Sequence, residues 1–335
     1  MPPAVRDALE KLGTSRDRNP ASFDLHDILI SLSELPPERA AQAGREIASA
    51  AQLWPYQQVR SWIGGVRSRP RPDLEILEKD ANSAWLFLFH HSGFMRESAL
   101  NAIRLPPISP FFLSAIILRL NDWVEPVRVA ATKCAMRVFP SVGPATAADT
   151  ALAFLRHHWT WGRWQEDEHA VLDGLFGRAD VITVLADRLT GGTAGALATC
   201  LRHALQYPAI DEHLSLLASN ATQPAVRATA LQCLISRKAS WPVGYQYQWI
   251  DKIYGVQKRV PVARDREISV QTPVEQLIRN GIADGSPMVR RVAVDALIAN
   301  RQTFPGIDLI VASLLRDRSP SIRERADFLV RHRTD

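Results

Sequence analysis

Chemically active side chains are crowded most densely between residues 157 and 169, where histidine, tryptophan, arginine and carboxylate residues alternate. Trp159, Trp161 and Trp164 flank Arg163, a combination typical of residues that anchor a partner peptide or stack on a base. The alternative is that these large rings only fill a gap in the packing of the fold. The histidines here match no helical spacing used by metal ligands, so we predict no metal site.

A second group of such side chains occupies residues 241–272, where aromatic and cationic residues are interleaved. Single-stranded nucleic-acid binders use this mixture for stacking and phosphate contacts, and protein interfaces use it too. Two prolines break the stretch, so we expect either a degenerate repeat or a long loop. The candidate partner-binding residues here are Tyr245, Tyr247, Trp249, Lys258, Arg259, Arg264 and Arg266.

Signatures of catalysis are missing from the sequence. It has no Gly-x-Ser-x-Gly motif, no phosphate-binding glycine loop and no paired-carboxylate motif, so we predict no catalytic residue and no cofactor. Its three cysteines are far apart, which suits a reducing compartment better than a disulfide framework. A net charge of +5 on 335 residues is too small to indicate nucleic acid by itself.

The elements that carry these side chains follow a repeat. Asp284-Gly-Ser-Pro-Met-Val-Arg290 recurs thirty-three residues later as Asp317-Arg-Ser-Pro-Ser-Ile-Arg323. The repeated arginine is found at positions 96, 128, 227, 290 and 323, and in each copy an alanine follows three residues later. Residues at this spacing share one face of a helix, and alanine there lets two helices approach closely.

Two helices per unit of about 32 residues cannot bury their apolar faces alone, so the units must stack. We therefore expect an all-α fold, a right-handed α-solenoid of antiparallel helix pairs of about 32–33 residues each. Residues 1–72 are expected to form an N-terminal helical cap, with a further helix starting at Pro55. Residues 73–335 are expected to form the repeat array, with the irregular insert at 240–272.

The pattern Asp, Pro, Val-Arg, Ala, Leu resembles the HEAT-repeat family, clearly over about residues 82–335, with armadillo repeats as the nearest competitor. The resemblance implies that the aspartates and arginines form a structural ladder, tying a turn to a helix of the same or the next repeat. We expect Asp122 to pair with Arg128, Asp284 with Arg290 and Asp317 with Arg323, whereas Arg227 has no aspartate six residues before it.

Arginines outside this ladder, among them Arg291 and Arg325, make the last two repeats basic. They could form a solvated terminal cap or an anion-binding patch. Insertions in repeat proteins tend to lie on the binding face, so the 241–272 stretch is the first candidate contact region.

These observations predict a non-enzymatic scaffold or adaptor that binds a protein partner on its concave face and insert. The alternative is a nucleic-acid-binding protein similar to the HEAT-like alkylpurine DNA glycosylases, although no catalytic residue of that family can be placed here. A HEAT-like lyase or hydroxylase is a third possibility, and the His-Glu pairs of the hydroxylases do not occur. No signal peptide or membrane-spanning run is evident, so we expect a cytoplasmic protein without a membrane partner.

Overall fold

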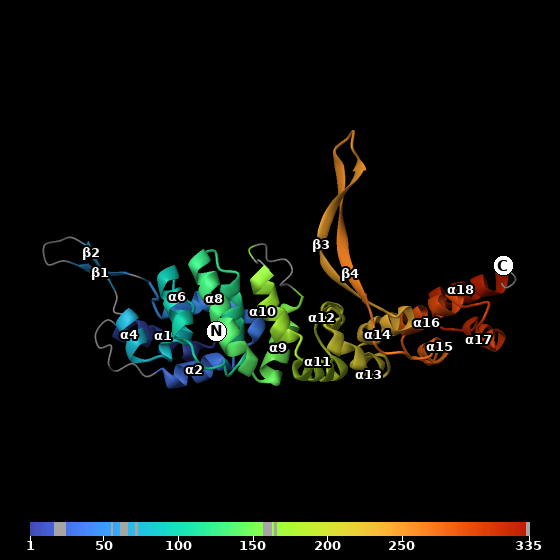
Figure 1. Cartoon of the computed structure of the whole chain (residues 1–335), viewed down its shortest axis with the longest axis horizontal. Helices are drawn as coiled ribbons and strands as arrows, with labels where there is room; N and C mark the ends of the chain where they lie inside the picture. The colour runs from blue at the N-terminus through green and yellow to red at the C-terminus, as the bar shows by residue number, and fades with distance from the viewer. Residues whose placement is uncertain are drawn as a thin grey trace. The chain divides into compact units, whose positions relative to one another are not determined.

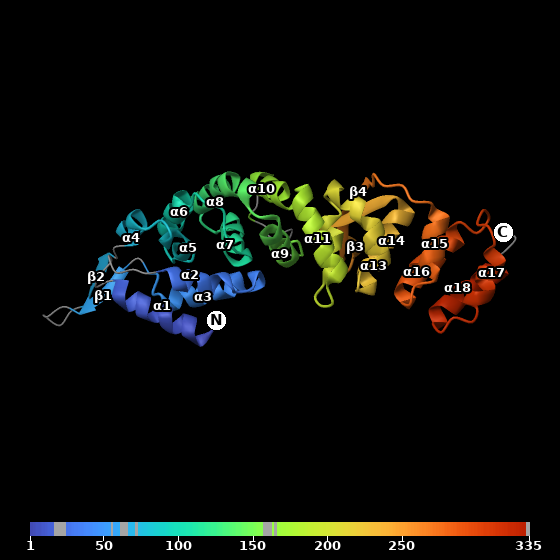
Figure 2. The same cartoon turned by 90° about the horizontal axis from the view of Figure 1, so that it is seen from below.

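The computed structural model describes residues 1–16, 25–54, 56–60, 66–70, 73–156, 163 and 166–332 of the chain. Most of these residues are helical, and the strands form two separate two-stranded sheets (Figures 1 and 2). The chain divides into two compact units, Met1–Phe176 and Gly177–Asp335. None of the helices described combines the length and apolar composition needed to cross a bilayer.

The first unit contains ten α-helices, two short 3-10 helices and one small sheet among its described residues. In chain order they are α1 (Pro3–Arg16), α2 (His26–Ser33), η2 (Pro37–Arg39), α3 (Ala40–Ala50), β1 (Tyr56–Arg60), β2 (Val66–Pro70), α4 (Asp73–Lys79), α5 (Ser83–Phe87), α6 (Gly93–Ala102), α7 (Pro110–Leu120), α8 (Glu125–Val138), η3 (Phe139–Ser141), α9 (Pro144–Phe154) and α10 (Glu166–Phe176).

The second unit consists of helices and one long hairpin. Its elements are α11 (Ala179–Gly191), α12 (Leu197–Ala204), η5 (Pro208–His213), α13 (Leu214–Asn220), α14 (Pro224–Ser236), β3 (Lys238–Asp251), β4 (Val256–Glu267), α15 (Val274–Ile282), α16 (Pro287–Ala299), α17 (Ile307–Leu314) and α18 (Pro320–Arg331).

Four of the five helices that carry the repeated arginine begin in the same way; α6, which carries Arg96, has no proline at its start. Helices α8, α14, α16 and α18 each have a proline in their first two positions, where a missing backbone N–H costs nothing and the fixed φ angle suits the helix. At α16 the Ser286 hydroxyl accepts a hydrogen bond from Met288 N at 3.3 Å. The short sequence signal before each arginine is therefore a helix start.

Neighbouring helices pack in pairs in the second unit. Helices α13 and α14, α15 and α16, and α17 and α18 contact each other, and α14, α16 and α18 contact in succession. The alanines three residues after each arginine are all fully buried; they are Ala99, Ala131, Ala230, Ala293 and Ala326. A small side chain at each of these places permits the close packing.

Residues 56–60 differ from the sequence-based prediction. The expected helix from Pro55 is wrong there, because β1 is extended and pairs antiparallel with β2, Tyr56 opposite Pro70 and Arg60 opposite Val66. Residues 57–60 and 66–69 can exchange backbone hydrogen bonds across the hairpin, which is a non-local option that helical spacing does not reveal.

The insert is neither a degenerate repeat nor an irregular loop. Strands β3 and β4 form one antiparallel hairpin that runs from the pair Lys238/Glu267 to the pair Asp251/Val256. The register shifts at Val243 and Ile250 mark two bulges in β3. Figure 1 shows the hairpin projecting from the helices of its own unit, α12 to α14.

Candidate functional site: an exposed β-hairpin

The base of the hairpin is clamped to the helices by one arginine. Arg266 on β4 donates from Nη2 and Nη1 to the two carboxylate oxygens of Asp211, at 2.6 and 2.9 Å. Its Nε and Nη2 also donate to the carbonyls of Leu205 and Tyr207, at 2.9 and 3.1 Å. Four such bonds hold one guanidinium in place, so Arg266 anchors the hairpin and offers no free cation to a partner.

The partner of this arginine is fully buried and charged. Burial alone would raise the pKa of Asp211, but hydrogen bonds from Arg266 and from the backbone and hydroxyl of Ser269 outweigh it and lower that pKa. Asp211 therefore stays ionised at neutral pH, and the ion pair fixes where β4 returns to the helices. Ala239 on β3 is also buried at this base.

One face of the hairpin, between its base and its tip, is aromatic. Tyr245, Tyr247 and Trp249 alternate along β3, so their side chains point to the same side of the hairpin, and they are 46%, 70% and 49% exposed. Arg259 lies opposite Tyr247, and its guanidinium carbon is 3.9 Å from the centre of the Tyr245 ring. This cation–π contact holds the arginine against the aromatic row without neutralising it.

The other face is aliphatic and basic. Lys258 pairs with Gln248, Val260 with Gln246 and Arg264 with Trp241. Both Lys258 and Arg264 are exposed, so each face of the hairpin carries positive charge. Nothing in the described chain pairs with the outer edges of β3 and β4, whose backbone groups remain available to another strand.

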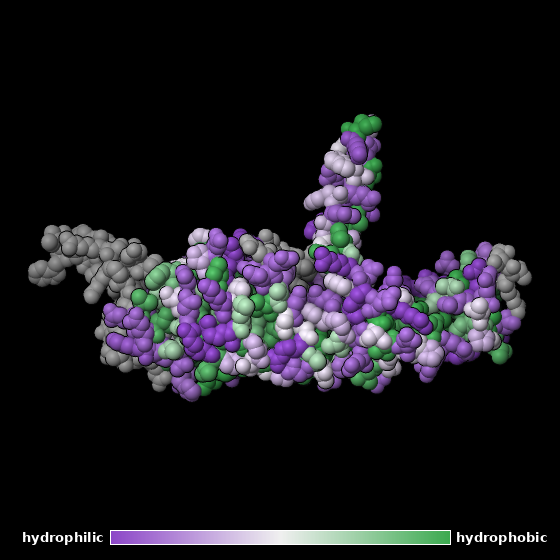
Figure 3. All heavy atoms as spheres, viewed as in Figure 1, coloured by the Kyte–Doolittle hydropathy of each residue, from purple (hydrophilic) through white to green (hydrophobic). Residues whose placement is uncertain are grey.

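The tip of the hairpin is apolar. The turn is closed by the Asp251 carboxylate, whose Oδ1 accepts hydrogen bonds from Ile253 N and Tyr254 N at 2.8 and 3.1 Å. Beyond it Ile253 is 90% exposed and Tyr254 81% exposed, with Ile250 beside them at 65%. Figure 3 shows hydrophobic residues gathered at this end of the hairpin. Apolar side chains so far from the core bury nothing in the chain itself.

The remaining sequence candidates are not part of the hairpin sequence. Trp159, Trp161 and Trp164 lie outside the described residues, and Arg163 between them is exposed. Arg291 is exposed on α16. Arg325 on α18 forms an ion pair with Asp295 on α16 and thereby links two helices. The alternation Tyr-Gln-Tyr-Gln-Trp over residues 245–249, with period two, is the signal that could have shown the hairpin.

The repeated arginines bind differently from the expectation. Each Nη1 donates to the backbone carbonyl six residues earlier, in the turn before its own helix; the pairs are Arg96 with His90, Arg128 with Asp122, Arg227 with Ala221, Arg290 with Asp284 and Arg323 with Asp317. The expected ion pairs within one turn are thus wrong. The aspartate carboxylates instead accept two hydrogen bonds from the Nε and Nη2 of an arginine earlier in the chain, an arrangement that we call the arginine fork. The pairs are Arg96–Asp122, Arg227–Asp284 and Arg290–Asp317.

One turn replaces aspartate by histidine. His90 lies six residues before Arg96, and its Nδ1 accepts a hydrogen bond from Ser92 N at 2.9 Å. This bond corresponds to the one that Asp122 Oδ1 accepts from Val124 N at 3.0 Å. The Nε2 of His90 then lies 3.1 Å from the buried carboxylate of Asp73. Because Nδ1 accepts, the proton resides on Nε2 and is donated to Asp73. His90 therefore preserves the turn of the ladder.

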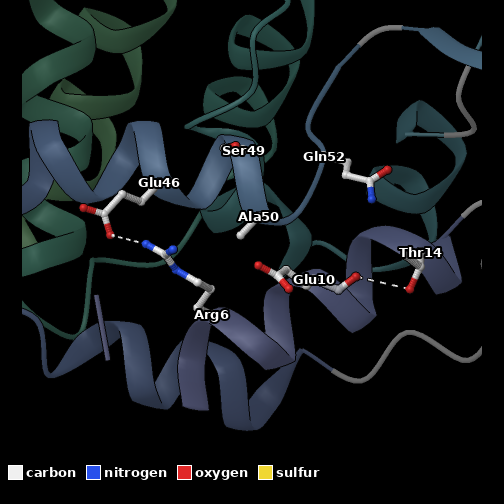
Figure 4. A pocket seen from close by; sticks show the side chains of 7 residues that line it. All are labelled: Arg6, Glu10, Thr14, Glu46, Ser49, Ala50 and Gln52. Carbon is white, nitrogen blue, oxygen red and sulfur yellow. Dashed lines mark hydrogen bonds and ion pairs between the residues drawn. The ribbon is translucent and has the colours of Figure 1, made fainter. Parts of the chain in front are cut away.

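The first unit contains hollows of its own. One hollow of about 440 Å³ lies between α1 and α3 (Figure 4). In it Arg6 lies 3.6 Å from the Glu46 carboxylate, and the Thr14 hydroxyl donates to the Glu10 carbonyl at 3.2 Å. These groups bind one another, and they lack a nucleophile with an adjacent base. Within the described ranges, no three His, Cys, Asp or Glu side chains gather as a metal ion requires.

Comparison with known proteins adds no relative: no protein-family model, no curated protein and no solved structure matches the chain.

Proposed function

We propose that this chain is a non-enzymatic binding protein, a right-handed α-solenoid of HEAT-like helix pairs that serves as a scaffold or adaptor for a protein partner. The partner contacts the concave face of the helical array and the β3–β4 hairpin. Support for the repeated arrangement comes from the arginine fork, which joins successive turns with the same geometry at Asp122, Asp284 and Asp317. Support for binding comes from the hairpin.

The main support for the proposal is the exposed apolar tip of the β3–β4 hairpin, whose base is held by the Arg266–Asp211 ion pair. Exposed Ile250, Ile253 and Tyr254 would fill an apolar pocket, and isoleucine finds no such pocket on a phosphate backbone. A two-stranded hairpin alone is marginally stable, so a partner that covers it would also stabilise it. Arg266 and Asp211 supply the rigid base from which the tip reaches out.

A second candidate function is nucleic-acid binding, as in the HEAT-like DNA glycosylases. It is favoured by Lys252, Lys258, Arg259 and Arg264, which are all exposed on the hairpin beside the aromatic row. Two other arginines predicted to contribute, Arg266 and Arg325, bind carboxylates of the chain itself. The cations that remain free are fewer than the sequence indicated, which favours the protein partner.

The test places a photo-crosslinking amino acid at position 254 and compares it with the same residue at position 309, where Leu309 on α17 is also exposed. We expect a discrete protein adduct from position 254 only, and we expect it to disappear when Ile253→Ser and Ile250→Ser are added. An adduct that survives these changes, or that forms equally at position 309, contradicts a docking role for the tip.

Salt-dependent binding to labelled duplex and single-stranded DNA and RNA separates the two candidates. A nucleic-acid role predicts affinity that falls steeply with salt and falls further in the double variant Lys258→Gln, Arg264→Gln. The protein-partner proposal predicts no specific complex with nucleic acid at any salt concentration, either for the wild type or for the double variant.

A further inference from the structure

A hollow of about 470 Å³ lies in the first unit. Helix α3 contributes Arg45 on one side, and the opposite side is formed by the segment that follows α5, by the end of α7 and by the turn before α8. Its lining includes His91, Arg96, Arg119 and the 72% exposed indole of Trp123. The volume lies in the range of small-molecule sites, which is about 300–1,000 Å³.

The wall of this hollow contains more positive charge than negative. Asp122 accepts two hydrogen bonds from Arg96, at 2.9 Å from Nε and 2.8 Å from Nη2, and a third from Arg119 Nη1 at 2.8 Å. The fourth comes from Val124 N at 3.0 Å. One carboxylate thus serves two guanidinium groups, and it has no lone pair left for either of them.

The second arginine on the carboxylate distinguishes this turn from the turns of Asp284 and Asp317. Asp284 and Asp317 each bind a single arginine fork, and the residues at the place of Arg119, three before each aspartate, are Gly281 and Leu314. Arg119 is therefore an addition to the ladder and not part of its repeating design. The side chain of Arg119 is 21% exposed, whereas that of Arg96 is 4% exposed, so Arg119 is the more accessible of the two.

Arg119 also has an unused donor. Its Nε is buried and finds no hydrogen-bond acceptor among the described residues. Burial and the nearby Arg96 lower the pKa of Arg119 to about 10 despite the attraction of Asp122, and at neutral pH the group remains charged. A charged guanidinium that lacks an acceptor at one of its donors is costly to bury, and an anion in the hollow would offset its charge.

Two further groups complete the lining. Arg45 is exposed on α3 and forms no ion pair with any described residue. His91 stacks on Trp54 with ring centres 4.4 Å apart, and burial, His90 and Arg96 lower its pKa, so it is neutral at pH 7 and adds a hydrogen-bonding group without charge. His90 and Asp73 behind it bind each other.

We propose that this hollow binds the oxyanion of a small phosphate monoester, held by the guanidinium groups of Arg119 and Arg45, with the rest of the ligand against the indole of Trp123. A phosphate monoester presents several strong acceptors and close to two negative charges, which suits Arg45 together with an Arg119 that shares its carboxylate with Arg96. The flat indole suits a planar ligand part, as in a nucleoside monophosphate. This site is independent of the hairpin and of its partner.

The experiment follows the arginine Nε–Hε resonances by NMR while inorganic phosphate or adenosine monophosphate is added to the whole chain. The Arg119 resonance is identified by its absence in Arg119→Lys. We expect it to shift with either ligand, adenosine monophosphate to bind more tightly, and Arg119→Gln to weaken binding by about tenfold or more, measured by calorimetry. Arg45→Gln, on an exposed helix face, should weaken it severalfold.

Arg291→Gln is the matched control, because Arg291 is likewise exposed on a helix but lies in the other unit. If Arg119→Gln does not fold, the pair Arg45→Gln and Arg291→Gln still decides the question. Phosphate binding that is unchanged in Arg45→Gln contradicts the proposal. So does the lack of any shift at millimolar phosphate, which would mean that water alone solvates Arg119.

Discussion

The guanidinium of Arg290 holds two consecutive turns of the chain together. Its Nη1 donates to the carbonyl of Asp284 at 2.9 Å in the turn before its own helix, while its Nε and Nη2 donate to the carboxylate of Asp317 at 2.8 and 2.9 Å. Asp317 then accepts from Ser319 N at 2.7 Å, which shapes the next helix start. The same side chain thus completes one turn and positions the following one.

Replacing this arginine by lysine should destabilise the second unit. Lysine cannot donate to a carbonyl and to both oxygens of a carboxylate in one plane, so Arg290→Lys is expected to lower the unfolding free energy by about 1–3 kcal/mol. Urea unfolding measures this. Arg291→Lys, one residue away and exposed, should change it by less than about 0.5 kcal/mol. Equal losses in both variants would mean that the fork contributes nothing.

The ladder carboxylates should make stability depend on acid. The hydrogen bond from Arg290 lowers the pKa of Asp317, and the bonds from Arg227 and Ser286 lower that of Asp284 although burial opposes them. Since the folded pKa is below the unfolded value of about 4, this stabilisation is complete above that pH and is lost as the pH falls through the folded pKa. Asp317→Asn should therefore be less stable than the wild type at pH 7, and the difference should shrink below about pH 4. A difference that does not vary with pH would contradict the pairing.

Helix α15 approaches its neighbours so closely that a methyl group cannot be added. A Cβ at Gly281 would lie 2.7 Å from the Cβ of Ala293 and 2.8 Å from a methyl carbon of Leu231. Gly281→Ala should therefore cost about 1–3 kcal/mol, although alanine favours helices. Gly285→Ala is the control, because nothing lies within 4 Å of the added carbon. Thermal unfolding of the two variants gives the comparison, and a neutral Gly281→Ala would show that α15 can shift.

The clamp at the base of the hairpin should determine how firmly β3 and β4 are held. Arg266→Gln leaves Asp211 buried without its cation, and we expect a loss of about 3 kcal/mol. Backbone amides of β4 near residue 266 should then exchange with deuterium faster than in the wild type. Arg264→Gln changes an exposed arginine two residues away on the same strand and should leave exchange unaltered. If both variants exchange alike, the hairpin is held by its backbone alone.

The amino-acid sequence by itself determined the helical elements of the repeats. The spacing of apolar residues, the proline at the start of α8, α14, α16 and α18, and the alanine that follows each arginine are local properties, because a helix satisfies its hydrogen bonds within one segment. Ala230, Ala293 and Ala326 are buried for the reason that their spacing predicts. The sequence likewise indicated residues 241–272 as the region where aromatic and basic side chains gather.

Only the tertiary structure decided which groups meet. Arg227 binds Asp284 across 57 residues because the whole β3–β4 hairpin and α15 are inserted between them, a distance that no fixed spacing predicts. The tertiary structure also showed that Arg266 is not a free cation, because it binds Asp211, which lies 55 residues earlier on η5. It placed Arg119 beside Arg96 on one carboxylate. Ion pairs and strand pairing join residues distant in sequence, so their partners follow from packing and not from local pattern.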